Sequence, residues 1–263
     1  MNSLNDGIQS NDYLRKGDHN FSQAWAAMMV GATKQGVHYE NDLTLTNCGV
    51  SVPFFNSVFI NTDRPVTIAD IETAKGFYSA AGKAFQFALR TPYAEQSADL
   101  LAHHGFQVER SMPGMFLPLD TWNTKAKPVS IDVVETTEDN LNHYFAIVSE
   151  AFEIPIWLTE RLLNRPFIQQ SNVILFLGYI DDEPACTSML VVTGDVAGIY
   201  WVGTKASSRK RGLGEMITAH AVHEAARRGH SVAYLQASKM GAPIYQRMGF
   251  RTLCDYSMWV CES

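Results

Sequence analysis

The chain has 263 residues, of which 46% are hydrophobic and 18% charged, and its formal net charge is −6. This composition is typical of a globular protein with a hydrophobic core, long enough for one large domain or two small ones. The acidic balance and the lack of a Lys/Arg-rich block argue against nucleic acid as the main partner. The sequence has neither an apolar run of membrane-spanning length nor a secretion signal, which favours a cytoplasmic protein without membrane association.

The first half of the chain alternates helical and extended patterns behind a polar segment. Residues 1–20 are expected to be a flexible lead-in. Apolar residues at helical spacing predict helices at 21–33, 67–82 and 93–105. Alternating or apolar runs predict strands at 42–49, 55–62, 84–90 and 106–119. Thr67 is the expected N-cap of the second helix. These elements are predicted to form a first domain over residues 21–119.

A polar stretch with one proline, residues 120–128, is expected to be a linker, and the pattern restarts after it. The second domain is predicted over residues 129–263. Its predicted strands lie at 130–135, 172–180, 185–194, 199–204, 231–236 and 252–260, and its helices at 137–152, 157–164, from 213 onward, and before Gly249.

A basic loop with two glycines joins the strand at 199–204 to the helix that starts at 213. The loop reads Arg209-Lys210-Arg211-Gly212-Leu213-Gly214. Glycines remove the Cβ atoms that keep an anion from the backbone, and the first N–H groups of a helix have no partner within the helix. The helix dipole adds to the three positive side chains. The loop therefore predicts a cradle for a diphosphate.

The spacing of the loop excludes two familiar phosphate-binding patterns. The chain contains no G-x-x-x-x-G-K-[ST] loop, and Ile217 stands where a dinucleotide-binding G-x-G-x-x-G sequence needs its third glycine. What remains is R-x-x-G-x-G, followed by a strand and by the sequence KMGAPIYQRMGF, in which Tyr245 lies four residues before Gly249-Phe250. These two motifs, in this order, resemble the GNAT superfamily of acyl-CoA N-acyltransferases.

The resemblance covers nearly all of the chain after residue 20 and is to the two-domain GNAT proteins. It implies an α+β (mixed α/β) fold of two GNAT-like domains, each with a mixed, mostly antiparallel central sheet flanked by helices. The first half is expected to be a degenerate, non-binding copy. Its 101–106 segment closes a helix with Gly105-Phe106, but Leu101 replaces the tyrosine, and TDRPVTIADIE offers no paired glycines where the cradle should be.

The resemblance also implies a cosubstrate, acetyl-CoA, and the residues that hold it. The strand from Trp201 to Thr204 would pair with the pantetheine amides, and the amides from Arg209 to Glu215 would hold the pyrophosphate. Tyr245 would act as the general acid toward the departing thiolate. The residues expected to bind the cosubstrate are Val202, Gly203, Thr204, Arg209, Lys210, Arg211, Gly212, Leu213, Gly214, Glu215 and Ser238.

The general base and the acceptor are less well defined by the sequence. Many relatives carry a glutamate on the motif strand, but residues 199–204 contain no carboxylate. Glu150 and Glu153 are either bases acting through water or solvated helix charges. The aromatic residues Trp157, Tyr200 and Trp201 either line an acceptor pocket or belong to the core.

The predicted activity is the transfer of an acetyl group from acetyl-CoA to the amine of a small molecule or peptide, by a monomer or a homodimer. The alternative is a non-catalytic acyl-CoA sensor that retains the cradle; a nucleotide-binding regulator is disfavoured. No metal is expected, since His220, His223 and Glu224 lack a further ligand at recognisable spacing. The cysteines have no C-x-x-C spacing and are expected to be reduced thiols: Cys48, Cys186, Cys254 and Cys261.

Overall fold

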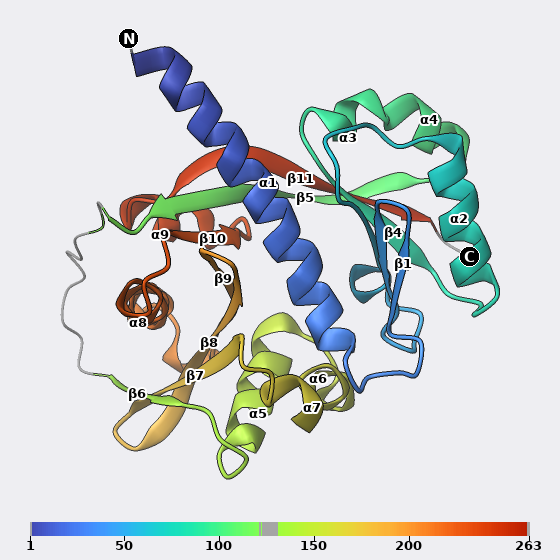
Figure 1. Cartoon of the computed structure of the whole chain (residues 1–263). Coiled ribbons are helices and arrows are strands. Elements are labelled where there is room, and N and C mark those ends of the chain that lie inside the picture. The colour runs from blue at the N-terminus through green and yellow to red at the C-terminus, as the bar shows by residue number, and fades with distance from the viewer. Residues whose placement is uncertain (1, 121, 123–130, 262–263) are drawn as a thin grey trace. The chain divides into compact units, whose positions relative to one another are not determined.

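The computed structural model describes residues 2–120, 122 and 131–261, and the chain divides into two compact units. Unit 1 consists of the described parts of Met1–Gly114 and Thr252–Ser263, and unit 2 of the described parts of Met115–Arg251. In each unit helices flank a mixed, mostly antiparallel sheet (Figure 1). The predicted fold class is confirmed.

In unit 1, the strands that precede β5 in the sheet pair in the order β1-β2-β3-β4-β11. Its elements are α1 (Asn2–Met29), β1 (Val37–Glu40), β2 (Leu43–Thr46), a 3-10 turn η1 (Pro53–Phe55), β3 (Ser57–Ile60), α2 (Ile68–Ser79), β4 (Phe85–Arg90), α3 (Tyr93–Gln96), α4 (Ala98–His103) and β11 (Arg251–Cys261). β5 (Gln107–Pro118) runs from unit 1 into unit 2. The pair β3–β4 is parallel and is connected through α2, whereas the other pairs of this unit are antiparallel.

The helix at the start of the chain differs from the sequence prediction. We expected a flexible segment up to residue 20, but α1 begins at Asn2 and continues to Met29. Its inner face is buried: Phe21 packs edge-on against Phe59 at 5.1 Å and Tyr256 at 5.3 Å. The polar sequence concealed the helix because its tertiary contacts within unit 1, more than its own apolar periodicity, fix it. No helix in the described ranges is long and apolar enough to cross a membrane.

Unit 2 contains strands that pair in the order β10-β9-β8-β7-β6. Its elements are β6 (Asp132–Glu135), α5 (Leu141–Phe152), α6 (Ile156–Leu162), α7 (Arg165–Ile168), β7 (Val173–Ile180), β8 (Glu183–Thr193), β9 (Val196–Thr204), a 3-10 turn η2 (Ala206–Ser208), α8 (Leu213–Arg227), β10 (Val232–Gln236) and α9 (Ala242–Arg247). β6 to β9 form an antiparallel meander, and β10 lies parallel to β9 because α8 crosses between them.

Helices α5 and α8 pack on opposite faces of the unit 2 sheet (Figure 1). A Cβ built at Gly178 would meet Cys186 and Ile217, so this face belongs to α8. The next side chain along β8, Thr187, lies on the other face, where a Cβ built at Gly203 would meet it and Ala151 of α5. Side chains that alternate along a strand point to opposite faces, so β8 contributes to both layers.

The division of the chain into units differs from the predicted one, which placed the boundary at residues 120–128 and assigned everything after it to the second domain. Most of that predicted linker lies outside the described residues. The strand β11 pairs with β4 from Tyr256↔Arg90 to Cys261↔Phe85, and Trp259 belongs to the core of unit 1. The core of unit 2 instead includes Met115 and Leu117 of β5. Linear sequence patterns do not show with which strand a final strand pairs.

Candidate active site

Strands β9 and β10 separate in the middle of the unit 2 sheet. Their parallel pairing covers Val196↔Val232 to Gly198↔Tyr234, while β9 continues to Thr204 and β10 to Gln236. The part of β9 beyond Gly198 therefore has an edge directed toward β10 but not paired with it in this register. The segment expected to bind pantetheine, Trp201 to Thr204, lies in this part. An extended ligand with amide groups could add to this edge as a strand does.

A β-bulge interrupts β9 at the beginning of this segment. The register with β8 runs from Met189↔Tyr200 to Thr187↔Gly203, so Trp201 and Val202 stand opposite a single residue, Ser188. Trp201 has a φ of 51°, a left-handed conformation that costs a non-glycine residue about 1–2 kcal/mol. Bulges re-aim backbone groups and are frequent beside active sites. The bulge could not be predicted from the sequence, because it depends on the register with the partner strand.

Two contacts fix the bulge. The Thr187 hydroxyl, which is fully buried, donates a hydrogen bond to the Trp201 carbonyl at 3.0 Å. The Trp201 ring packs edge-on against Phe152 at the end of α5, with ring centres 5.0 Å apart. Gly203 leaves the room that this arrangement needs, because a Cβ there would lie 3.0 Å from Thr187 Oγ1 and 3.1 Å from Ala151 Cβ. Gly203 thus has a packing role in addition to its predicted place in the binding strand.

The basic loop after β9 forms the predicted turn into α8. Lys210 and Gly212 have positive φ values of 63° and 80°, and Gly212 is the N-cap of the helix. Cβ atoms built at Gly212 and Gly214 would meet nothing within 4 Å, so open space lies above the first turn. Within the described part of the chain, the backbone N–H groups from Lys210 to Glu215 donate to no other group outside the helix itself. The geometry is that of an anion-binding helix N-terminus.

The side chains of the loop divide into two kinds. Arg209, Lys210 and Arg211 are exposed, and the Arg209 guanidinium donates to the Thr204 carbonyl at 3.3 Å. Leu213, in contrast, is buried in the core of unit 2 and can offer a ligand only its backbone. The start of the loop is held by Glu150, whose carboxylate accepts the Ala206 N–H at 2.6 Å. That bond gives Glu150 a structural role beside the loop, and Glu153 lies exposed at the end of α5.

Tyr245 lies on α9, and its side chain is buried against the first turns of α8. Burial raises the pKa of the Tyr245 phenol to about 12, while a hydrogen bond with the Thr218 side chain opposes the rise. Thr218 in turn donates to the Gly214 carbonyl at 2.7 Å. The tyrosine and the second glycine of the loop are therefore connected through one side chain. Thr218 was not among the residues singled out from the sequence, since a threonine inside an amphipathic helix has no distinguishing spacing.

Other residues expected at the site have local structural roles. Ser238 accepts the Gly241 N–H through its hydroxyl at 3.1 Å and so supports the start of α9. Tyr200 and Trp201 are largely buried, whereas Trp157 is 49% exposed on α6. Exposed Phe152 and Ile156 accompany Trp157 at the junction of α5 and α6. Of the aromatic residues considered for an acceptor pocket, Trp157 alone offers a substantially exposed ring.

The histidines and cysteines pack within the fold. His220 lies 4.9 Å from Phe176, and burial lowers the pKa of its imidazole. His223 packs edge-on against Trp122 at 4.7 Å. The described residues contain no group of three His, Cys, Asp or Glu side chains arranged to hold a metal ion. Burial raises the pKa of the Cys186 and Cys254 thiols to about 12, which keeps both thiols protonated.

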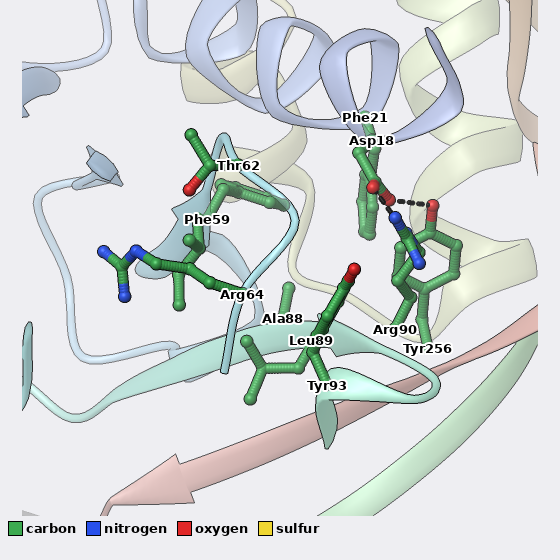
Figure 2. A pocket seen from close by; sticks show the side chains of 11 residues that line it. Asp18, Phe21, Phe59, Thr62, Arg64, Ala88, Leu89, Arg90, Tyr93 and Tyr256 are labelled. Carbon is green, nitrogen blue, oxygen red and sulfur yellow. Dashed lines mark hydrogen bonds and ion pairs between the residues drawn. The ribbon is translucent and has the colours of Figure 1, made fainter. Parts of the chain in front are cut away.

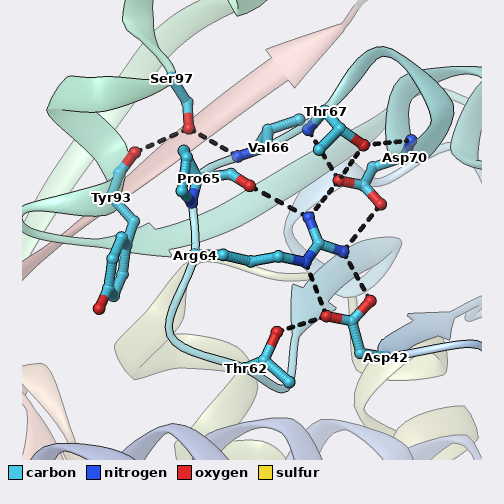
Figure 3. Close-up of polar contacts among 9 residues, drawn as sticks. All are labelled: Asp42, Thr62, Arg64, Pro65, Val66, Thr67, Asp70, Tyr93 and Ser97. Carbon is cyan, nitrogen blue, oxygen red and sulfur yellow. Dashed lines mark hydrogen bonds and ion pairs between the residues drawn. The ribbon is translucent and has the colours of Figure 1, made fainter.

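The corresponding turn of unit 1, between β3 and α2, contains a network of side chains (Figure 3). Arg64 donates to both Asp42 at 2.6 Å and Asp70 at 2.6 Å. Thr67 is the N-cap of α2, as predicted, and forms a reciprocal capping box with Asp70. The Thr67 N–H thus donates to the Asp70 carboxylate and the Asp70 N–H to the Thr67 hydroxyl, so both donors are occupied by the chain itself. An added phosphate would meet negative charge there.

Two hollows lie near α1 in unit 1. One, shown in Figure 2, has a volume of about 30 Å³, enough for roughly one water molecule. Its polar groups pair with each other: Arg90 and Tyr256 donate to Asp18, both at 2.6 Å. The other has a volume of about 330 Å³ and is bordered by the Arg15–Asp63 ion pair, in which Arg15 Nε lies 2.6 Å from Asp63 Oδ2. These charges neutralise one another, and neither hollow resembles the loop of unit 2.

Comparisons with known proteins relate most of the second unit to a known family. Residues 132–253 match the family model described as an acetyltransferase (GNAT) domain. The whole chain is similar to the structure of a GCN5-related N-acetyltransferase from Kribbella flavida, with a TM-score of 0.68 and 19% identity over 92% of this chain and 95% of that one. The chain is also similar to the structure of a GCN5-related N-acetyltransferase from Sphaerobacter thermophilus, with a TM-score of 0.63 and 17% identity over 86% of this chain and 82% of that one.

A conserved protein of unknown function from Staphylococcus epidermidis ATCC 12228 is similar as well, with a TM-score of 0.65 and 13% identity over 88% of this chain and 96% of that one. No curated protein matches in sequence. At these identities the structures show a shared fold, which extends over both units, and the family model supplies the assignment. Residues 132–253 thus match the GNAT acetyltransferase domain family.

Proposed function

We propose that this chain is an N-acetyltransferase that transfers an acetyl group from acetyl-CoA to the amine of a small molecule or peptide. The proposal rests on three features that occur together in unit 2. Unit 2 contains the separation of β9 from β10, the open first turn of α8 and the buried Tyr245, which is linked to Gly214 through Thr218. An extended pantetheine, a diphosphate and a departing sulfur would each meet a group suited to it.

Each step of the proposed reaction has a residue or backbone group that would carry it out. The amine nitrogen attacks the thioester carbonyl carbon, and a backbone N–H of the bulge stabilises the oxyanion that forms. The carbon–sulfur bond then breaks while the phenolic O–H of Tyr245 donates a hydrogen bond to the departing sulfur. The ammonium releases its extra proton to water, which leaves the amide and the CoA thiolate as products. The amides of Lys210 to Glu215, with the exposed basic side chains of the loop, bind the pyrophosphate.

The missing carboxylate on β9 bears on the choice of amine. An amine with a pKa of about 10.4 costs about 4.6 kcal/mol to deprotonate at pH 7, whereas an α-amine near 7.8 costs about 1 kcal/mol. Glu150 is engaged with the Ala206 N–H, which makes it a poor candidate for the base. We therefore propose that the acceptor is a weakly basic amine, for which no strong base is needed.

A second candidate function is that of an acyl-CoA-binding sensor without catalysis. The absence of a carboxylate from residues 199–204 favours it. The test is thiol release from acetyl-CoA with a panel of α-amines and alkylamines, together with calorimetric measurement of CoA binding. Turnover that is fastest for weakly basic amines supports the enzyme. Tight binding without turnover on any amine supports the sensor, and absence of CoA binding contradicts both.

A further inference from the structure

The bulge in β9 contains a backbone carbonyl that is held by a side chain of β8. Thr187 Oγ1 donates to the Trp201 carbonyl at 3.0 Å, and both groups are buried. In a planar trans peptide the carbonyl and the following N–H point in opposite directions. Because β8 and β10 lie on the two sides of β9, a Trp201 carbonyl directed toward β8 turns the Val202 N–H toward β10.

The Val202 N–H is therefore aimed at the region where β9 and β10 have separated. Pairing with β10 ends at Gly198, before the bulge, so this side of Val202 is not covered by the β10 ladder. The left-handed conformation of Trp201, with a φ of 51°, is what rotates this peptide relative to the rest of the strand. Without the Thr187 hydroxyl, the buried Trp201 carbonyl would lack the hydrogen bond that fixes this rotation.

We propose that Thr187 is a positioning residue: by holding the Trp201 carbonyl, it orients the Val202 N–H toward the thioester carbonyl oxygen of bound acetyl-CoA. This inference rests on the proposed function. Thr187 touches neither the substrate nor the reacting atoms and acts only through the peptide between Trp201 and Val202. Gly203 is part of the same arrangement, since a Cβ there would lie 3.0 Å from the Thr187 hydroxyl.

Three variants separate this role from packing. Thr187→Val keeps the shape and removes the hydroxyl, whereas Thr187→Ser keeps the hydroxyl and removes a methyl group. Ser188→Ala is the matched control, because Ser188 is equally buried on the same strand but donates to the Ile217 carbonyl of α8, at 3.3 Å. If Thr187→Val does not fold, judged by circular dichroism, Thr187→Ala takes its place.

Two measurements are made on each variant. The first is the infrared band of the thioester carbonyl of ¹³C-labelled acetyl-CoA bound without an amine, which reports hydrogen bonding to its oxygen. The second is steady-state turnover. We expect Thr187→Val to bind CoA as the wild type does, to lose the downward shift of the carbonyl band, and to lower kcat by about tenfold or more. Removal of an entire oxyanion donor typically costs about 10²- to 10³-fold. Thr187→Ser should restore both values, and Ser188→Ala should change neither.

If Thr187→Val keeps the band shift and the kcat of the wild type, the proposal is wrong. It is also wrong if Ser188→Ala loses the band shift and kcat to the same extent as Thr187→Val, or if Thr187→Ser does not restore them. The carbonyl band keeps this test distinct from the test of catalysis. A shift that depends on Thr187 in a protein without turnover would support the positioning role and contradict the enzyme. If acetyl-CoA does not bind, both proposals fail.

Discussion

Tyr245 holds its proton throughout the pH range in which enzymes are normally assayed, because burial raises the pKa of its phenol to about 12. A thiol such as that of cysteine has a pKa of about 8.5, so complete proton transfer from Tyr245 to a CoA thiolate is uphill. The phenol therefore helps mainly by donating a hydrogen bond to the sulfur as negative charge develops there. The contribution of Tyr245 to the rate therefore lies at the low end for a general acid.

We expect Tyr245→Phe to lower kcat by about 10²-fold, near the bottom of the usual range for general acids, without weakening CoA binding. The ring still packs against Phe250 and α8, so the free energy of unfolding should change by less than about 1.5 kcal/mol. Steady-state kinetics and calorimetry provide the measurements. Tyr144→Phe removes the hydroxyl of a second buried tyrosine of unit 2, which donates to the Ser188 carbonyl, and should leave kcat unchanged. Wild-type turnover by Tyr245→Phe would assign the tyrosine to packing alone.

The ion pairs around Arg64 predict how unit 1 responds to acid. Hydrogen bonds from Arg64 lower the pKa of Asp42 to about 2, from an ordinary value of 3.8. A carboxyl whose pKa is lowered on folding stabilises the protein fully above its unfolded pKa, and this stabilisation is lost as the pH falls through the folded value. Asp42 should therefore contribute to stability above about pH 4 and lose that contribution between pH 4 and 2.

In thermal unfolding followed by circular dichroism, the melting temperature of Asp42→Asn should fall less steeply between pH 4 and 2 than that of the wild type, and lie lower at pH 6. Glu72→Gln makes the same charge change at an exposed position of α2 and serves as the control. Parallel curves for Asp42→Asn and the wild type would mean that the Arg64 pair does not contribute to folding.

At the scale of elements, the first turn of α8 is subject to two opposing requirements. A negative charge there would stabilise the helix of the free protein but would prevent a diphosphate from binding. A negative side chain near a helix N-terminus stabilises the helix by about 0.3–1 kcal/mol through the dipole. The same charge excludes a diphosphate from the amides. Gly214 has room for a side chain and no positive φ, so its Cβ adds no strain.

Gly214→Asp should thus raise the melting temperature of the free protein and abolish CoA binding in calorimetry. Gly214→Ala adds a Cβ without charge; it should stabilise the helix to a similar degree and reduce affinity far less. Gly212 is less suitable, because its φ of 80° would strain any other residue. Unchanged CoA affinity in a folded Gly214→Asp protein would show that the first turn of α8 does not bind CoA.

The elements around the site differ in how far the sequence could predict them. The strand β9, the turn with paired glycines and α8 follow from local periodicity and composition, and each was predicted close to its observed position. The helix predicted over 93–105 is divided into α3 and α4 at Ser97, whose hydroxyl bonds the Tyr93 carbonyl. The bulge at Trp201 and its contact with Thr187 could not be predicted, because register and side-chain contacts between strands are properties of the folded sheet.

At the scale of the whole molecule, each unit has a parallel strand pair connected through a helix: β3–α2–β4 in unit 1 and β9–α8–β10 in unit 2. The two helix N-termini differ in chemistry. That of α8 follows three exposed basic residues and a glycine, whereas that of α2 is occupied by the Thr67–Asp70 capping box beside Asp42. One unit is open to an anion and the other is internally neutralised.

We therefore expect one CoA to bind per chain, in unit 2. Calorimetry should give a stoichiometry of one for the wild type and no binding for Gly214→Asp. A stoichiometry of two, or a residual site in Gly214→Asp, would show that unit 1 binds CoA despite the carboxylates at the start of α2.

The place of β11 in unit 1 has a consequence for biosynthesis. β4 has β3 on one side and β11 on the other, and the ribosome delivers β11 only after all of unit 2 has been synthesised. Until then β4 is an exposed edge that can pair with other chains, and Phe85, Phe87 and Leu89 lack the cover of Trp259. Unit 2 can form its sheet first. The segment of the nascent chain that needs protection from aggregation would therefore be β4 in the first half of the chain, not the residues synthesised last.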